Sequence, residues 1–271
     1  MGPELSPQLF SIFSALIEER AGIHYTIRDR DLLRDKLAVR AAEAGFDSLL
    51  DYYYFLRYDP GGDVEFAALV DTLVVGETYF FREWGQVVAL VDRELVPLAG
   101  ERPIRIWSAA CSTGEEPLSL AMLLNERGIL DRTTIVASDI SRQALARART
   151  TVRSRRSVRA VPDPALAERW LEVGETEVRV DPALVSTIDW RRINLLDRPD
   201  VERLGTFDAI LCRNVLIYFS DEVIGRVIAS LLSVLRPGGV VAVGVSESLL
   251  RFGGQLVSEE KGGFFFYRRA T

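Results

Sequence analysis

The spacing of apolar residues along the chain changes once, near residue 75. Before that point apolar residues recur at intervals of three and four, as in segment 7–21, which follows Ser6 and stops at Gly22. This spacing places apolar side chains on one face of a helix, and serine and glycine are common at helix starts and ends. Similar patterns predict further helices, so that residues 1–75 form a small all-α domain; these patterns cover 29–44, 47–58 and 63–74.

From residue 103 onward, short apolar runs alternate with longer amphipathic stretches. Continuous apolar strands that alternate with helices are typical of a parallel sheet covered on both faces. We therefore predict a doubly wound, mostly parallel α/β domain over residues 103–271. The expected strands are IRIWSAA, TIVASD, TFDAILC, GVVAVGV and a closing GGFFFYRR, and the expected helices lie near 115–127, 141–150 and 221–235.

Two segments fit these patterns less well. Residues 76–102 are expected to link the two domains, with a helix near 84–96. The stretch 151–192 contains a short helix after Pro164 and strand-like pieces around 176–180 and 185–190. We interpret this stretch as a small insertion between successive strands of the sheet.

Composition narrows the class of protein. Lys and Arg total 33 and Asp and Glu total 39, which gives a net charge of −6 and argues against a surface built entirely for nucleic acid. Two cysteines cannot form a disulfide framework, no apolar run reaches the roughly 18 residues of a membrane span, and the start lacks a secretion pattern. We therefore expect a cytoplasmic protein, without membrane insertion, that acts as a monomer.

The first predicted strand leads into a loop of small residues, WSAACSTGEEP. Ligands of doubly wound sheets bind beyond the carboxyl ends of strands, and small residues such as Ala109 and Gly114 let a ligand approach the backbone. The loop is not a G-x-G-x-x-G motif. Glu115 and Glu116 at the helix start would repel a pyrophosphate and suit an ammonium or sulfonium group; alternatively, they only complement the helix dipole.

Asp139 ends the second predicted strand, twenty-five residues after Gly114. An acidic side chain at this position commonly binds ribose hydroxyls, although Asp139 could instead cap the helix that opens with Ser141. The loop and the acid together favour a nucleoside ligand without a diphosphate. S-adenosylmethionine (SAM), which carries a positive sulfur, fits that description.

Several motifs resemble, in the same order, those of the chemotaxis receptor methyltransferases, the CheR family. They are GETYFFRE, WSAACSTGEEPLSLAM, ASDIS, INLLD, FDAILCRNVLIYFS and RPGGVVAVGVSESL, and the helical first domain also fits. The resemblance implies a Rossmann-like enzyme that transfers a methyl group from SAM to glutamate side chains on the cytoplasmic helices of chemoreceptors, leaving S-adenosylhomocysteine. Two alternatives stay open: a non-catalytic scaffold that binds SAM or its product, and a methyltransferase for another carboxylate or a small molecule.

The resemblance also implies roles for individual residues. Arg82 and Tyr218 are the expected catalytic residues, on opposite sides of the methyl group. Glu115 resembles the acid near the amino-acid end of the cofactor, and Asn194 and Leu195 resemble the pair beside the adenine. The full set expected to contact the cofactor is Thr78, Arg82, Ala109, Glu115, Asp139, Asn194, Leu195, Arg213 and Asn214.

This chemistry requires neither a general base nor a metal ion. An exposed glutamate has a pKa of about 4.3, so the nucleophile is already ionised near pH 7. Arg82 would position the carboxylate through its planar guanidinium, and Tyr218 would hold an oxygen or the donor. The alternatives are a surface pair between Arg82 and Glu77 or Glu83, and a core position for the Tyr218 ring.

Other residues receive structural interpretations. The only histidine, His24, is expected to be structural or solvent-facing, and Cys111 and Cys212 are interpreted as small buried residues. Two positions depart from the pattern of the family: Gly76 stands where asparagine is common, and Val245 stands where histidine is common.

A run of arginines between residues 142 and 159 indicates what kind of partner the protein binds. Because a basic surface attracts glutamate-rich helices, and because no PPY-type motif of nucleobase methylation is present, we favour an acidic protein helix over nucleic acid. Arg30 and Arg34 could extend that surface. The stretch 171–190 looks shorter and less glycine-rich than in members that bind a receptor tail, so we predict no tail binding. The run, which contains no acidic residue, comprises Arg142, Arg147, Arg149, Arg153, Arg155, Arg156 and Arg159.

Overall fold

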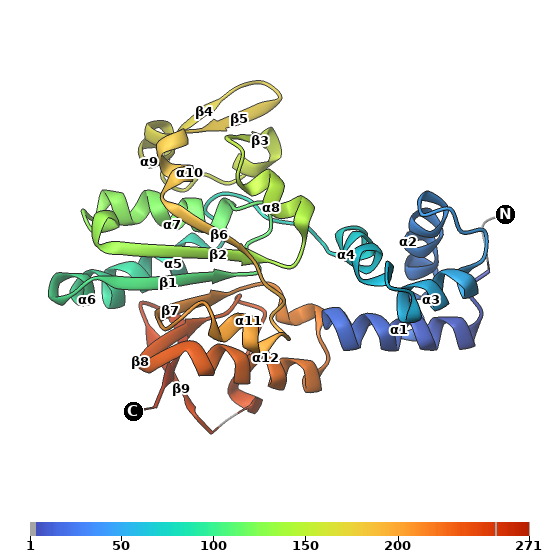
Figure 1. Cartoon of the computed structure of the whole chain (residues 1–271). Coiled ribbons are helices and arrows are strands. Elements are labelled where there is room, and N and C mark those ends of the chain that lie inside the picture. The colour runs from blue at the N-terminus through green and yellow to red at the C-terminus, as the bar shows by residue number, and fades with distance from the viewer. Residues whose placement is uncertain (1–3, 253, 271) are drawn as a thin grey trace.

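The computed structural model describes residues 4–252 and 254–270, with a helical domain beside a larger α/β domain (Figure 1). The first helix begins where the Ser6 hydroxyl accepts a hydrogen bond from the Leu9 N–H group and ends at Gly22, whose φ is 78°. The apolar faces of the helices enclose a core that includes Phe13, Leu33 and Tyr52. The elements are α1 (Pro7–Ala21), η1 (Ile27–Asp29), α2 (Arg30–Glu43), α3 (Leu49–Tyr58) and α4 (Gly62–Leu73).

The α/β domain is built on a sheet that, within the described residues, has the strand order β6-β2-β1-β7-β8-β10-β9. The first five strands in this order run parallel, and β10 is antiparallel to both β8 and β9. The predicted mostly parallel, doubly wound fold is therefore confirmed. The strands are β1 (Ile104–Ala109), β2 (Thr133–Asp139), β6 (Ile188–Arg192), β7 (Phe207–Cys212), β8 (Leu235–Ala242), β9 (Leu256–Lys261) and β10 (Phe264–Arg269).

Alternate side chains of β1 pack into different cores on the two faces of the sheet. Ile104 and Ile106 join the core that contains α5, α6 and α7, whereas Trp107 and Ala109 join the core that contains α11 and α12. This alternation explains why the central strands are apolar throughout. The covering helices are α5 (Trp84–Leu90), η2 (Val91–Leu95), α6 (Val96–Glu101), α7 (Glu115–Glu126), α11 (Arg198–Glu202) and α12 (Asp221–Val234).

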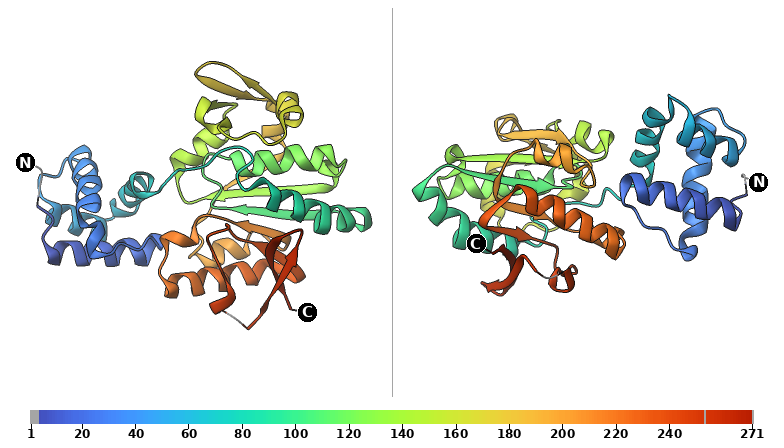
Figure 2. Two further views of the ribbon diagram at one scale, coloured as in Figure 1. Left: turned by 180° about the vertical axis from the view of Figure 1, so that it is seen from behind. Right: turned by 60° about the horizontal axis from the view of Figure 1, so that its bottom comes forward.

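The segment between β2 and β6 forms a small separate sheet with the order β3-β5-β4, which projects from the domain in Figure 1 and in the left view of Figure 2. The strand expected around 185–190 is β6, which pairs with β2 in the main sheet and does not belong to the insertion. Because its residues are polar and half-exposed, the sequence indicates a strand here but not its place at the edge of the main sheet. The elements of this region are α8 (Arg142–Ala148), β3 (Val152–Ser154), η4 (Arg155–Val158), α9 (Pro164–Trp170), β4 (Leu171–Val173), β5 (Glu177–Val180) and α10 (Pro182–Ser186).

The helical domain contacts the α/β domain at the carboxyl ends of its parallel strands (Figures 1 and 2). Ile23 forms an antiparallel bridge with Phe219, and the Asp71 carboxylate accepts a 2.6 Å hydrogen bond from the Ser141 hydroxyl. The helical domain therefore covers the edge of the sheet where ligands of this fold class bind. The remaining short turns are η3 (Leu130–Arg132), η5 (Leu216–Tyr218) and η6 (Leu250–Phe252). Across the described residues, none of the helices has the length and apolar character that crossing a membrane requires.

Candidate functional site

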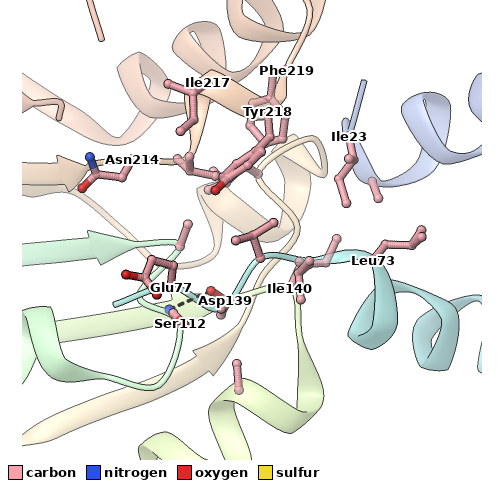
Figure 3. A pocket seen from close by; sticks show the side chains of 18 of the residues that line it. Ile23, Leu73, Glu77, Ser112, Asp139, Ile140, Asn214, Ile217, Tyr218 and Phe219 are labelled. Atoms are coloured by element: carbon pink, nitrogen blue, oxygen red, sulfur yellow. Dashed lines mark hydrogen bonds between the residues drawn. The ribbon is translucent and has the colours of Figure 1, made fainter. Parts of the chain in front are cut away.

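A cavity of about 490 Å³ lies between the carboxyl ends of β1, β2 and β7 and the helical domain. Its volume is within the range of small-molecule sites, roughly 300–1,000 Å³. In Figure 3, Ser112 and Asp139 lie on one side of this space and Asn214 and Tyr218 on the other. The helical domain contributes part of the wall, including Ile23. Ligand contacts can therefore come from both domains.

The backbone around the cavity adopts unusual conformations. Non-glycine residues with positive φ, which are uncommon, occur in the described part of the chain only at three places: the linker, the end of β1 and the end of β7. Such conformations persist where surrounding structure enforces them, and they concentrate at functional sites. The residues are Phe81 (63°), Glu83 (48°), Ala110 (58°), Ser112 (50°) and Asn214 (58°).

The loop after β1 is held against the end of β2. The Asp139 carboxylate accepts hydrogen bonds from the backbone N–H groups of Ser112 (2.8 Å) and Ser141 (2.9 Å). Burial raises the pKa of this carboxyl above its usual range. The Ser112 hydroxyl is buried and has no hydrogen-bond partner among the described residues. Asp139 and Ser112 both line the cavity and can accept or donate further bonds to a ligand.

The side chains of the two glutamates in the loop point in different directions. Glu116 lines the cavity, whereas the expected Glu115 does not: its carboxylate is buried and accepts hydrogen bonds from Thr113 (2.7 Å) and Ser157 (3.0 Å). Adjacent positions at a helix start point in different directions, which the sequence alone does not resolve. Burial raises the pKa of Glu116, and its neighbour Arg213 opposes this effect.

Arg213 connects the linker to the end of β7. Its guanidinium donates to Glu116 (2.9 Å), to Glu83 (3.0 Å) and to the backbone oxygen of Arg82 (2.9 Å). Burial alone would raise the pKa of Glu83, but hydrogen bonds from Asn214 and Arg213 bring it below its ordinary value. Glu83 is therefore occupied by these partners and does not pair with Arg82.

Arg82 and Tyr218 both line the cavity. The Arg82 guanidinium donates to the backbone oxygen of Glu77 (3.0 Å), so the surface ion pair considered as an alternative is not formed. The Tyr218 ring points into the space in Figure 3, which differs from a core position. His24 also lines the cavity, and its backbone N–H group donates to the backbone oxygen of Tyr218 at 2.9 Å. The fold thus brings His24 beside Tyr218, although the two are far apart in the sequence.

Asn194 and Leu195 form part of the cavity wall, but the amide of Asn194 is already engaged. Its nitrogen donates to the backbone oxygen of Arg20 at 2.7 Å, and its oxygen accepts from the Leu196 N–H group at 3.1 Å. The Asn194 side chain therefore holds the helical domain against this wall. A ligand can then contact Asn194 through its backbone.

The other predicted positions divide between wall and core. Ala109 is buried in β1 and does not line the cavity; the neighbouring Ala110 does. Both cysteines are buried and free, and burial raises the pKa of each thiol. The wall also includes Thr78, Gly76, Cys111, Arg213 and Asn214.

Only some arginines of the run are exposed and free of hydrogen bonds or ion pairs between their side chains and other described residues. Arg153 is buried and donates to the backbone oxygens of Ala148 and Thr150, both at 2.8 Å, so it is structural. Arg159 pairs with Glu77, and Arg149 donates to the Trp190 oxygen. Arg34, in α2, pairs with Asp31 and Asp35, so its charge is balanced locally. The exposed members whose guanidinium groups make no hydrogen bond or ion pair with another described residue, which we call the basic surface, are Arg142, Arg147, Arg155 and Arg156.

Comparison with known proteins identifies two matching family descriptions. "CheR methyltransferase, all-alpha domain" matches residues 8–74, and "CheR methyltransferase, SAM binding domain" matches residues 76–260. The chain is 34% identical to chemotaxis protein methyltransferase 2 of Vibrio cholerae, over 89% of this chain and 86% of that protein. It is 36% identical to chemotaxis protein methyltransferase 2 of Pseudomonas aeruginosa, over 84% and 82%. The probable biofilm formation methyltransferase WspC of Pseudomonas putida is 34% identical, over 88% of this chain and 56% of that protein.

The residues around the cavity fit SAM. Asp139 offers a carboxylate at the end of β2, where ribose hydroxyls bind in this fold class. The Glu116 carboxylate also lines the cavity, where it accepts hydrogen bonds from the Ser108 hydroxyl (2.6 Å) and from Arg213 (2.9 Å). The unpartnered Ser112 hydroxyl supplies a further polar group. Within the described residues, no three His, Cys, Asp or Glu side chains are grouped to hold a metal ion.

Proposed function

Since the chain belongs to the CheR methyltransferase family, we propose that it methylates glutamate side chains on the cytoplasmic helices of a chemoreceptor. Membership makes the chain a SAM-dependent methyltransferase. The chemotaxis role of two of its relatives supports a receptor as the substrate. The observation that carries the proposal is that Arg82 and Tyr218 line one cavity together with Asp139 and Glu116.

The chain's own residues need to position the reactants and exclude water. When bound, SAM supplies a methyl group on a positively charged sulfur, and its transfer to a carboxylate oxygen breaks the carbon–sulfur bond and leaves S-adenosylhomocysteine. The attacking glutamate is ionised near pH 7, because its ordinary pKa is about 4.3, so no side chain has to remove a proton. Holding two reactants in line can contribute on the order of 7–11 kcal/mol.

Arg82 and Tyr218 divide this positioning task in our proposal. The Arg82 guanidinium orients the substrate carboxylate through its planar set of donors, and the Tyr218 hydroxyl holds an oxygen or the donor group. Asp139 binds the ribose of the cofactor, and Glu116 takes the role that the sequence suggested for Glu115. Support for these roles comes from the shared cavity and from the strained linker that carries Arg82.

The proposal is tested by methyl transfer from methyl-tritiated SAM to a purified chemoreceptor cytoplasmic fragment. Glutamyl methyl esters release labelled methanol in alkali, and we expect the label to be alkali-labile and to disappear when the glutamates of the fragment are replaced by alanine. Labelling that resists alkali would favour another methylated group, and transfer only to other proteins or small molecules would favour a different substrate.

Two substitutions test the site within the same assay. We expect Arg82→Ala and Tyr218→Phe each to lower turnover by well over threefold, which corresponds to more than about 0.7 kcal/mol of transition-state stabilisation. Matched controls are Arg93→Ala and Tyr58→Phe, whose side chains are exposed away from the cavity and which should leave turnover unchanged. Turnover within threefold of the parent in the two test variants contradicts the assigned roles.

A further inference from the structure

The carboxylate of Glu247, in the loop after β8, accepts hydrogen bonds from four backbone N–H groups. One oxygen accepts from Leu216 (2.7 Å) and Ile217 (3.3 Å), and the other accepts from Asn214 and Gly244 (both 2.7 Å). Charge-assisted bonds of this kind are roughly twice as strong as neutral ones. A single side chain therefore joins the ends of β7 and β8.

Three of these donors belong to the segment that carries Tyr218. Leu216 and Ile217 begin η5, whose own preceding residue supplies no side-chain cap, so Glu247 satisfies N–H groups that the turn leaves free. Tyr218 is the last residue of η5, one position beyond Ile217. The bonds to Glu247 thus fix the turn from which the tyrosine side chain projects into the cavity.

Gly244 and Asn214, which both donate to the Glu247 carboxylate, are tightly packed around it. A Cβ atom on Gly244 would lie 2.5 Å from the side-chain amide nitrogen of Asn214 and 2.9 Å from the Glu247 carboxylate, so a larger residue there would displace these side chains from their present contacts. Asn214 has a φ of 58° and is held on its other side by a 3.0 Å hydrogen bond from its amide to Glu83. Two carboxylates therefore hold the strained Asn214 from both sides, one through its side chain and one through its backbone.

The contact requires a carboxylate and not only a polar side chain of that shape. Both oxygens of Glu247 accept from N–H groups, whereas glutamine has one acceptor oxygen and one NH₂ donor. In a glutamine variant the NH₂ group must face either Leu216 and Ile217 or Asn214 and Gly244, and it repels those donors. One half of the contact is then lost with almost no change in volume.

We propose that Glu247 is a positioning residue that holds Tyr218 in its working orientation by capping η5 from the loop after β8. The proposal rests on the assignment of Tyr218 to the methyl-transfer site. It assigns a task to the SES segment of the sequence, which none of the cofactor or catalytic roles considered above uses.

The test compares Glu247→Gln with Glu260→Gln, a matched change on exposed strand β9. We expect Glu247→Gln to lower kcat by about tenfold or more, while the SAM dissociation constant measured by calorimetry changes by less than about fivefold. In a Tyr218→Phe background, Glu247→Gln should lower kcat by less than about threefold, because the effects of residues that act through one another are not additive. Glu260→Gln should leave all three values unchanged.

Hydrogen–deuterium exchange supplies a readout that does not depend on catalysis. Exchange in the peptide that contains residues 213–219 should accelerate in Glu247→Gln and not in Glu260→Gln. The proposal is overturned if exchange does not change, if kcat stays within about twofold of the parent, or if the costs of Glu247→Gln and Tyr218→Phe multiply. If Tyr218→Phe alone has no effect on turnover while exchange still accelerates, the site assignment has failed and the contact itself has not.

Discussion

Gly114 shows how one backbone conformation determines the shape of the cavity. Gly114 lies at the turn between β1 and α7, and its φ is 92°, a backbone conformation that residues with a side chain rarely adopt. A Cβ atom at this position would lie 2.7 Å from the ring of Trp190 in β6. The glycine therefore allows the loop after β1 to pack directly against the edge strand.

We expect Gly114→Ala to lower the free energy of unfolding by about 1–3 kcal/mol, through backbone strain and the clash with Trp190. Because the loop contributes Ser112 to the cavity, SAM affinity should also fall by about tenfold or more. Urea denaturation and calorimetry measure the two effects. Gly100→Ala is the matched control, since no described residue has an atom within 4 Å of a Cβ at that position in α6, and it should be neutral or stabilising by up to about 1 kcal/mol.

For the two glutamates of the loop, the residue pattern predicts the kind of ligand but not which side chain reaches the cavity. The composition of WSAACSTGEEP indicates a ligand without a pyrophosphate and with a positive charge, and the side chain that reaches the cavity is Glu116 rather than Glu115. The difference depends on the hydroxyls of Ser157 and Thr113, which donate hydrogen bonds to the Glu115 carboxylate. Ser157 lies in the insertion, so only the folded chain brings this pairing about.

At the scale of elements, Asp208 joins three strands of the sheet at the end opposite the cavity. Its buried carboxylate accepts hydrogen bonds from Arg102 (2.5 Å), from the Arg105 N–H group (2.8 Å) and from Arg236 (2.8 Å). These residues precede or belong to β1 and β8, while Asp208 belongs to β7. Burial alone would raise the pKa of Asp208, but the three donors together bring it below its ordinary value.

A carboxyl group whose pKa is lowered by folding stabilises the protein above its unfolded pKa, about 3.9 for aspartate, and this contribution is lost as the pH falls through the folded value. We therefore expect Asp208→Asn to lower the free energy of unfolding by about 2 kcal/mol near pH 7. The difference from the parent should shrink below about pH 4. Urea denaturation at the two pH values measures it, with Asp189→Asn on exposed edge strand β6 as a control that should change stability by less than about 0.5 kcal/mol. An equal loss at both pH values would contradict the electrostatic explanation.

The apolar pattern predicts elements well where their side chains are buried, on one face of a helix or on both faces of a central strand. The helices of the first domain and the strands β1, β2, β7 and β10 lie where their apolar patterns predict them, whereas β8 begins and ends earlier than the predicted GVVAVGV segment. β6 and β9 are less evident in the sequence, because both lie at the edges of the sheet and carry charged residues. An edge strand is defined by its pairing with a neighbour, and pairing leaves little trace in local composition.

At the scale of the whole molecule, the basic surface lies close to the linker that carries Arg82. The backbone oxygen of Ser157, which follows Arg155 and Arg156 in η4, accepts a 2.7 Å hydrogen bond from the Phe80 N–H group. A chain of net charge −6 thus presents exposed arginines beside its candidate site. Clustered charge of this kind raises association rates for partners of opposite sign.

Reversing two of these charges tests their proposed role in attracting an acidic helix. We expect Arg155→Glu combined with Arg156→Glu to lower kcat/KM for a receptor fragment by about tenfold at low salt, while SAM affinity does not change. The loss should shrink between about 0.05 M and 0.5 M salt, because screening shortens the range of the interaction. The control pair Arg93→Glu and Arg226→Glu makes the same change of charge on η2 and α12. Equal losses in both pairs would mean that net charge matters and the location of the arginines does not.

The fold classes of the two domains, the order of the central strands along the chain and the chemical character of the ligand could be predicted from residue patterns alone, because burial patterns and loop composition are local properties. Which side chains meet depends on the packing of the folded chain. This packing placed Tyr218 beside His24, turned Glu116 toward the cavity, used Asn194 to hold the helical domain, and brought Glu247 to the turn of η5. These contacts join residues that are distant along the chain, so their geometry arises only when the helical domain, linker and sheet pack against one another.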